Sequence, residues 1–190
     1  RGAFSGWSAR AAFNRGQILY RIAEMLEGRK DQFLEELKQL GYTPAAAKKE
    51  VEQSIDRLDY YAGWCDKYQQ LFSSVNPVAT SHFNFSVPEP MGVVAILADE
   101  SSALLGLVSV IAPAIAGGNT CIVLASESKP TCSITFAEVI ATSDVPGGVV
   151  NIVTGSRKEL HSHFSSHMDV NAIINCNSEK DFNKTIGENA

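Results

Sequence analysis

The residues whose types could do chemistry form two groups, a pair of carboxylates and a cluster of histidines. Asp99 and Glu100 are adjacent. A general acid and a general base must reach the same substrate, which neighbours in one loop rarely do, so we interpret both as solvated or salt-bridged charges. His163 and His167 have the spacing that places two metal ligands on one helix face. No carboxylate or thiol lies at a matching spacing, so we expect no metal site.

The four cysteines are scattered along the chain and form no C-x-x-C pair, which argues against a zinc site or a redox dithiol. They are Cys65, Cys121, Cys132 and Cys176. Thiols in this pattern are typical of the buried, reduced cysteines of cytosolic proteins. The sequence therefore predicts a cytoplasmic protein.

Composition excludes several classes of function. The 190 residues carry a net charge of -5 and no basic block, so we expect binding to neither nucleic acid nor an anionic membrane. The longest apolar stretch, residues 103–116, is too short to span a bilayer. The chain begins at Arg1 without Met and stops soon after a strand-like run, so we expect a piece of a longer protein.

Helices are predicted for residues 1–82. Apolar stripes favour helices over residues 10–26 and 31–40. Thr43 and Pro44 supply a cap and a first-turn proline for a long third helix. The apolar face of this helix is expected to run as far as Leu71 or Phe72.

Strands and helices alternate in residues 83–190. The alternation in residues 83–87 indicates a half-buried strand. Short apolar runs then predict strands at 93–97, 120–124, 149–153 and 170–174, with helices between them at 103–116, 131–142 and 157–165. This order predicts a doubly wound parallel sheet, whose ligands bind beyond the carboxyl ends of the strands. The residues that follow the strands are 98–102, 125–128, 155–156 and 175–178.

Several segments, in order and spacing, resemble the aldehyde dehydrogenase superfamily. They are Gly6-Trp7-Ser8, Tyr60-Tyr61-Ala62-Gly63-Trp64, Glu89-Pro90-Met91-Gly92, Ala116-Gly117-Gly118-Asn119-Thr120 and Pro146-Gly147-Gly148-Val149-Val150-Asn151. The resemblance implies the family's Rossmann-type domain for NAD or NADP. It also implies that the catalytic half, with the nucleophilic Cys, lies outside this chain. Residues 1–190 then form one partial domain, with N-terminal helices at 1–82 and βα units at 83–190.

The resemblance also marks two turns where this sequence departs from the family. Glu100 takes the place of the Asn that donates to the oxyanion, and an ionised Glu only accepts hydrogen bonds. After the second βα strand, Leu124 takes the place of the Lys that bonds the adenosine ribose, while Ser126 and Glu127 are kept. Lys129 could replace that Lys, although its spacing differs.

A third departure follows the fourth strand of the βα units. Asn177 takes the place of a Gly that lets the pyrophosphate approach a helix N-terminus, and Ser178 is kept. The remaining cofactor-binding positions are therefore vestigial, and no cofactor is expected.

The pattern of kept fold signatures and lost ligand turns is similar to a family-16-type aldehyde dehydrogenase with a second, non-catalytic domain. It favours a pseudoenzyme module that acts in structure, oligomerisation or docking of a protein partner, and self-association is expected. The alternative is part of an active NAD(P)-dependent aldehyde dehydrogenase that oxidises aldehydes to carboxylic acids.

Overall fold

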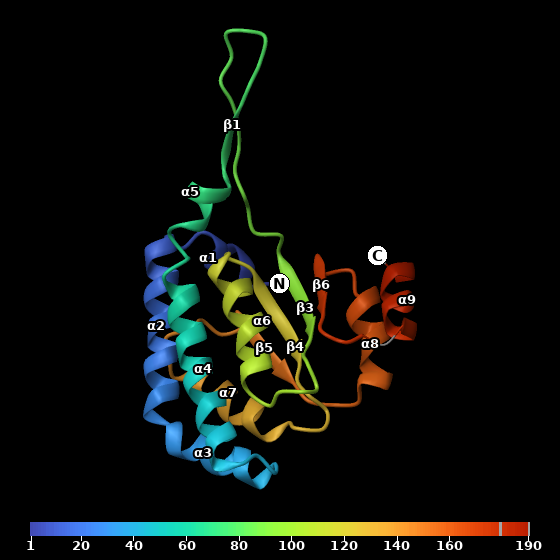
Figure 1. Cartoon of the computed structure of the whole chain (residues 1–190). Coiled ribbons are helices and arrows are strands. Elements are labelled where there is room, and N and C mark those ends of the chain that lie inside the picture. Colours follow the sequence, from blue (N-terminus) through green and yellow to red (C-terminus); the bar gives the residue numbers. More distant parts are fainter. Residues whose placement is uncertain (179, 190) are drawn as a thin grey trace.

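The structure, a computed structural model, describes residues 1–178 and 180–189, with Asp181 described in its backbone alone. Helices and strands follow one another along the chain, and Figure 1 shows their arrangement. The helices are α1 (Phe4–Ser8), α2 (Ala12–Gly28), α3 (Lys30–Gln39), α4 (Pro44–Ala62), α5 (Tyr68–Phe72), α6 (Leu105–Ala116), α7 (Thr131–Ala141), α8 (Arg157–Ser166) and α9 (Lys180–Asn189). The strands are β1 (Ser74–Asn76), β2 (Asn84–Ser86), β3 (Val93–Leu97), β4 (Thr120–Leu124), β5 (Val150–Val153) and β6 (Ala172–Asn175).

Four parallel strands form the central sheet in the order β5-β4-β3-β6. The chain moves outward from β3 to β4 and β5, and then crosses to place β6 on the other side of β3. The strands are apolar runs because both faces of the sheet are covered. Val94 and Ile96 pack into the large core formed with α2, α4 and α6, whereas Ala95 and Leu97 pack with Phe164 of α8.

Helices therefore cover both faces of the sheet. α2, α4, α6 and α7 lie on one side in Figure 1, and α8 and α9 lie on the other. The prediction of a doubly wound parallel α/β fold preceded by helices is confirmed. Among the helices of the described residues, none combines the length and apolarity that a bilayer span requires.

The N-terminal helices pack onto the sheet layer through α4, which contacts both α2 and α6. The predicted cap of α4 is confirmed, because the Thr43 hydroxyl accepts a hydrogen bond from Ala46 N at 3.3 Å and Pro44 opens the helix. The predicted extent of this helix is wrong. It ends at Ala62, and Leu71 and Phe72 belong to the separate short helix α5, where both side chains are exposed.

Both halves of the chain share one core. Trp7 is 1% exposed, and its indole N–H donates to the carbonyl oxygen of Ile115 in α6 at 3.0 Å. Buried Arg15 of α2 donates from Nε to the carbonyl oxygen of Ala116 at 3.2 Å. Residues 1–82 and 83–190 are thus in direct contact, and the predicted boundary between them falls in the projecting arm.

The arm consists of residues 73–88, in which β1 and β2 pair antiparallel. Figure 1 shows it extending away from the body of the molecule. The prediction of a strand near residues 83–87 is confirmed, but the prediction that it is half-buried is wrong: Phe83 is 74% exposed and Phe85 is 59% exposed. A two-stranded ribbon has no helix or second sheet beneath it, so both of its faces meet solvent.

Candidate functional site at the carboxyl edge of the sheet

The parallel strands β3, β4 and β5 all end at one edge of the sheet, where ligands of doubly wound folds bind. Three segments meet there: Glu100 in the loop after β3, residues 126–128 in the loop after β4, and Arg157 at the start of α8 after β5. Their side chains bond to one another across the strand ends. We take this edge as the candidate site.

The carboxylate of Glu100 lies at the centre of this group. Its Oε2 accepts hydrogen bonds from the hydroxyls of Ser126 at 2.7 Å and Ser128 at 2.6 Å, and from Ser128 N at 3.2 Å. Its Oε1 accepts one from Glu127 N at 2.8 Å. Four donors from the loop after β4 therefore converge on one carboxylate of the loop after β3.

Arg157 completes the surroundings of Glu100. Its Nε lies 2.5 Å from Glu100 Oε1 as an ion pair, without the alignment of a hydrogen bond. Its Nη2 donates to the carbonyl oxygen of Ala98, and its backbone N–H donates to Glu127 Oε2 at 2.9 Å. The residue is 6% exposed, and among the described residues its Nη1 has no hydrogen-bond partner.

These contacts decide the charge of Glu100. Partial burial raises the pKa of its carboxyl, but the hydrogen bonds from Ser128, Ser126 and the two backbone N–H groups outweigh burial and lower the pKa to about 2. Glu100 is therefore ionised at neutral pH. Glu100 was interpreted as a solvated or a salt-bridged charge, and the structure shows the salt bridge.

Four of the residues named from the resemblance lie at or just after the end of β4. Ser126 and Glu127 are part of the group around Glu100, whereas the side chain of Leu124 is fully buried and packs against the apolar cluster beneath α8. The ammonium of Lys129 donates to the carbonyl oxygen of Ser101 at 2.7 Å. Lys129 is thus committed to the loop after β3. The vestigial cofactor role of these positions stays a prediction.

Asn177 and Ser178 follow β6, on the other side of β3 from β4. The backbone N–H of Asn177 donates to Asn175 Oδ1 at 3.2 Å, and its side-chain amide donates to the same atom at 3.1 Å. The structure thus places these two predicted residues beside β6 rather than in the group around Glu100. Their role toward a pyrophosphate also stays a prediction.

The N-terminus of α6 faces the same edge and is already capped from within the chain. Glu50 of α4 is 9% exposed, and its Oε1 accepts hydrogen bonds from the hydroxyl of Ser102 and from the backbone N–H groups of Ala103, Leu104 and Leu105, at 2.9 to 3.3 Å. A helix N-terminus attracts anions. Here the anion is a side chain of the N-terminal helices.

Sequence reasoning included Ser128 only as one of the residues after the strand at 120–124, and it missed Arg157 and Glu50. Position carried a signal for two of them, because a serine and an arginine next to the ends of parallel strands must lie near one another. Glu50 gave no such signal. Its partners lie far along the chain, and only the packing of α4 on α6 brings them to it.

The cysteines and a cavity on the helical side are not part of the group around Glu100. Cys65, Cys121 and Cys132 are buried and Cys176 is partly buried, and burial raises the pKa of each thiol. Raised thiol pKa values mean that few thiolates exist at neutral pH, so these four are poor nucleophiles.

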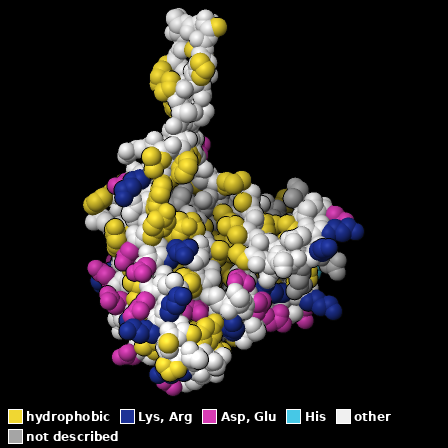
Figure 2. Space-filling model, in the orientation of Figure 1, with side chains coloured by type: hydrophobic (Ala, Val, Ile, Leu, Met, Phe, Trp, Pro, Cys, Tyr) yellow, Lys and Arg dark blue, Asp and Glu magenta, His cyan; other side chains and the backbone are white. Residues whose placement is uncertain are grey.

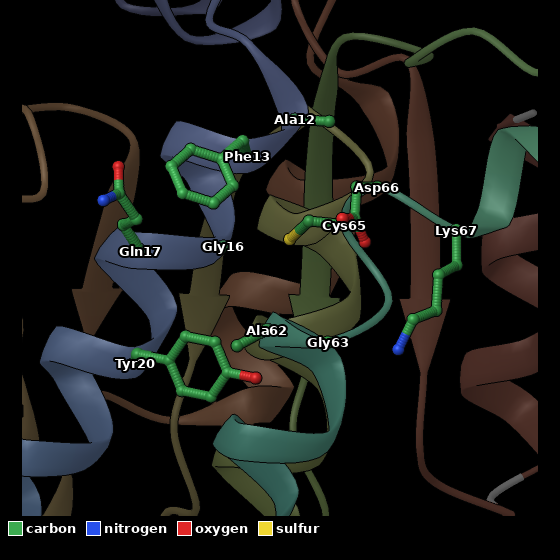
Figure 3. A pocket seen from close by; sticks show the side chains of 10 residues that line it. All are labelled: Ala12, Phe13, Gly16, Gln17, Tyr20, Ala62, Gly63, Cys65, Asp66 and Lys67. Atoms are coloured by element: carbon green, nitrogen blue, oxygen red, sulfur yellow. The ribbon is translucent and has the colours of Figure 1, made fainter.

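Cys65 lines a cavity of about 350 Å³ between α2 and the segment after α4, together with Phe13 and Tyr20 (Figure 3).

The arrangement at the edge can hold strands β3, β4 and β5 in register at their ends. Its hydrogen-bond donors are directed at Glu100 rather than outward, and α6 is capped by Glu50. Within the described part of the chain we find no group of three or more His, Cys, Asp and Glu side chains able to hold a metal ion.

The chain is similar in sequence to known proteins. The model of the aldehyde dehydrogenase family matches residues 1–190. The cytosolic 10-formyltetrahydrofolate dehydrogenase of Mus musculus is 32% identical over 170 residues, which cover 88% of this chain and 19% of that protein. Aldehyde dehydrogenase, cytosolic 1, of Elephantulus edwardii is 32% identical over 173 residues, which cover 89% of this chain and 34% of that protein.

Solved structures also resemble this chain. The crystal structure of PnpE in complex with nicotinamide adenine dinucleotide superposes with a TM-score of 0.91 at 27% identity and covers 98% of this chain. The match covers 38% of the PnpE chain, so the present chain spans well under half the length of its relatives. With its parallel sheet, its N-terminal helices and a family match along its whole length, the chain belongs to the aldehyde dehydrogenase family.

Proposed function

We propose that this chain is a non-catalytic aldehyde-dehydrogenase-like module, similar to the second domain of a family-16-type enzyme, that serves assembly in a larger parent protein. Its role is to hold the quaternary arrangement or to dock a protein partner. The observation that carries the proposal is the arm, residues 73–88. The proposal includes a cytoplasmic location.

The arm has the properties of an interaction element. No Asp, Glu, Lys or Arg occurs between Lys67 and Glu89. Val75, Phe83 and Phe85 of the arm are each more than half exposed, and Figure 2 shows hydrophobic side chains on it without acidic or basic ones. Its two strands pair with each other alone among the described residues, which leaves two edges free for hydrogen bonding. Soluble proteins usually protect such edges with charge or cover them with another chain.

The carboxyl edge supports the non-catalytic part of the proposal, because it fits a dinucleotide poorly. The buried Leu124 offers no donor to a ribose, and the carboxylate of Glu100 adds negative charge beside the loop after β4, which disfavours an anionic dinucleotide there. The N-terminus of α6 already holds the carboxylate of Glu50.

A second candidate is part of an active NAD(P)-dependent aldehyde dehydrogenase. The likeness to the NAD complex of PnpE favours it, since that structure holds the dinucleotide on a closely similar backbone. In that case NAD or NADP would bind despite the internal contacts of Glu100, and the catalytic Cys would come from outside this chain.

Titration with NAD and NADP separates the two candidates. We expect no saturable heat in calorimetry with the purified chain, or with a parent protein whose catalytic domain is altered so that it no longer binds the cofactor. Binding in the micromolar range would contradict the non-catalytic assignment and favour the second candidate.

The assembly role needs its own test. We expect the chain to self-associate in sedimentation equilibrium, and the double variant Phe83→Lys, Phe85→Lys to weaken association at least tenfold, because charge on an exposed strand opposes edge pairing. Ile134→Lys is the matched control, since Ile134 is 53% exposed on α7 and far from the arm in sequence. A monodisperse monomer would contradict the predicted self-association. Equal weakening by both variants would show that general hydrophobicity, and not the arm, drives it.

A further inference from the structure

We propose that the loop after β4 and Arg157 form a binding site for a small carboxylate, and that Glu100 is its internal ligand. The donors of this site are the hydroxyls of Ser126 and Ser128, the backbone N–H groups of Glu127 and Ser128, and the guanidinium of Arg157. Glu100 occupies the site in the native chain and keeps it closed to free anions.

The Glu100 carboxylate is surrounded by a large number of donors. One partly exposed carboxylate receives four hydrogen bonds and one ion pair, all from segments other than its own. A carboxylate has room for about four acceptor contacts, so both of its oxygens are saturated.

The donors are held in place by contacts that do not involve Glu100. The backbone N–H of Lys129 donates to Ser126 Oγ at 3.1 Å, which folds the loop. The backbone N–H of Arg157 donates to Glu127 Oε2 at 2.9 Å, and its Nη2 bonds to the carbonyl oxygen of Ala98. The loop and the guanidinium therefore keep their positions when the Glu100 carboxylate is removed.

The buried guanidinium is an independent argument. Arg157 is 6% exposed, its Nη1 has no hydrogen-bond partner among the described residues, and Glu100 is its ion-pair partner. Loss of the anion beside this guanidinium is unfavourable, so an anion from solvent is expected to enter the site when the Glu100 side chain is removed.

The ligand class follows from size and charge. A carboxylate reproduces the head group of Glu100, whereas Asp99 and Glu127 add negative charge nearby and disfavour more highly charged ligands. We therefore assign a monocarboxylate of the size of formate or acetate. The assignment does not depend on the proposed assembly role, because it concerns the carboxyl edge and not the arm.

The experiment is chemical rescue of Glu100→Ala. Thermal unfolding of the chain is followed at neutral pH as sodium acetate replaces sodium chloride at constant ionic strength. We expect the melting temperature of Glu100→Ala to rise in a saturable way, with half-saturation on the order of 1 mM to 10 mM for so small a ligand. The wild type, whose site is full, and Glu100→Gln, whose amide fills the same space, are expected to show no saturable rise.

Glu138→Ala is the matched control, because Glu138 forms an exposed ion pair with Arg29 at 2.7 Å outside this site. We expect acetate to leave its melting temperature unchanged. A phosphate titration tests the ligand class, and phosphate is expected to raise the melting temperature of Glu100→Ala much less than acetate does.

Several outcomes would overturn the proposal. A linear response of all variants means a general salt effect, and a saturable response of the wild type means that Glu100 does not fill the site. If Glu100→Ala does not fold in chloride, refolding in acetate gives the answer: recovery in acetate supports the site, and failure in both salts while Glu100→Gln folds rules it out. NAD binding by the wild type would count against the proposed function without bearing on these results.

Discussion

The carboxyl edge of the sheet and the arm use polar and apolar groups in opposite ways. At the edge, Glu100, Glu127 and Arg157 bond to one another and to backbone groups, and Glu50 caps α6. On the arm, charge is absent and phenylalanines are exposed. The polar groups of the edge bond mainly within the chain, whereas the apolar side chains of the arm are exposed, and we propose that another surface covers them. The edge should therefore govern stability, and the arm should govern association.

The largest expected effect on stability is that of Leu124→Lys. Leu124 is 0% exposed and packs with Ala95 and Leu97, so a lysine there loses apolar packing and places an ammonium in an apolar cluster. We expect unfolding free energy to fall by about 3 kcal/mol or more in urea denaturation. Leu124→Met, which keeps the volume, should cost less than about 1.5 kcal/mol. A stable Lys variant that gains NAD affinity would restore the role expected from the family resemblance.

Glu50→Ala should have the next largest effect. It leaves one partly buried hydroxyl and three backbone N–H groups at the start of α6 without their acceptor. We expect a loss of about 2 kcal/mol in unfolding free energy, measured by chemical denaturation. Glu52→Ala is the control on the same helix, since the Glu52 side chain is 45% exposed and its ion pair with Lys30 lies at the surface, and its denaturation midpoint should stay close to that of the wild type. Equal midpoints for both variants would mean that Glu50 does not stabilise the edge.

Glu100→Gln sharpens the comparison through its pH dependence. The pKa of Glu100 is lowered from 4.5 to about 2, so the folded state favours the ionised form. The stabilisation is complete above about pH 5 and is lost as the pH falls from 4.5 toward 2. Because the side chain is 34% exposed, we expect only about 1 kcal/mol between wild type and Glu100→Gln at neutral pH. Unfolding curves that differ equally at pH 3 and pH 7 would contradict the ion pair.

Phe85→Lys should have the smallest effect on stability. A large effect would contradict the view that the arm governs association and not stability. Phe85 is 59% exposed and contacts Phe83 of the same arm at a ring distance of 5.4 Å. We expect the unfolding free energy of dilute protein to change by less than about 0.5 kcal/mol, while the concentration dependence of the melting temperature is reduced. A large loss at low concentration would show that the arm belongs to the core.

Much of the fold could be predicted from the sequence because buried parallel strands are short, continuous apolar runs bounded by turn residues. Residues 120–124 were predicted as a strand and form β4, and residues 93–97 form β3. Thr43 and Pro44 gave the start of α4 for an equally local reason. The end of that helix was wrong, because the apolar stripe continues past Gly63, which is the C-cap residue where α4 ends.

The candidate site was predicted in part. The edge of the sheet and the positions after each strand followed from the alternation of strands and helices, and Glu100 was expected to be a solvated or salt-bridged charge. Its ion-pair partner Arg157 was not predicted, because Arg157 lies after a different strand and no local pattern links the two residues. The exposure of the arm was also missed, since an alternating strand has the same sequence whether its apolar face meets a core, another chain or water.

The sequence by itself determined the fold class and the family of this protein, because both rest on local patterns of apolar spacing, glycines and prolines. The tertiary structure alone decided how charge is distributed over that fold. Glu50 meets the start of α6, and Glu100 meets Arg157, only after helices and strands far apart in the chain have packed. Electrostatic pairing depends on distances between atoms of a few ångströms, and those distances are set by packing and not by order along the chain.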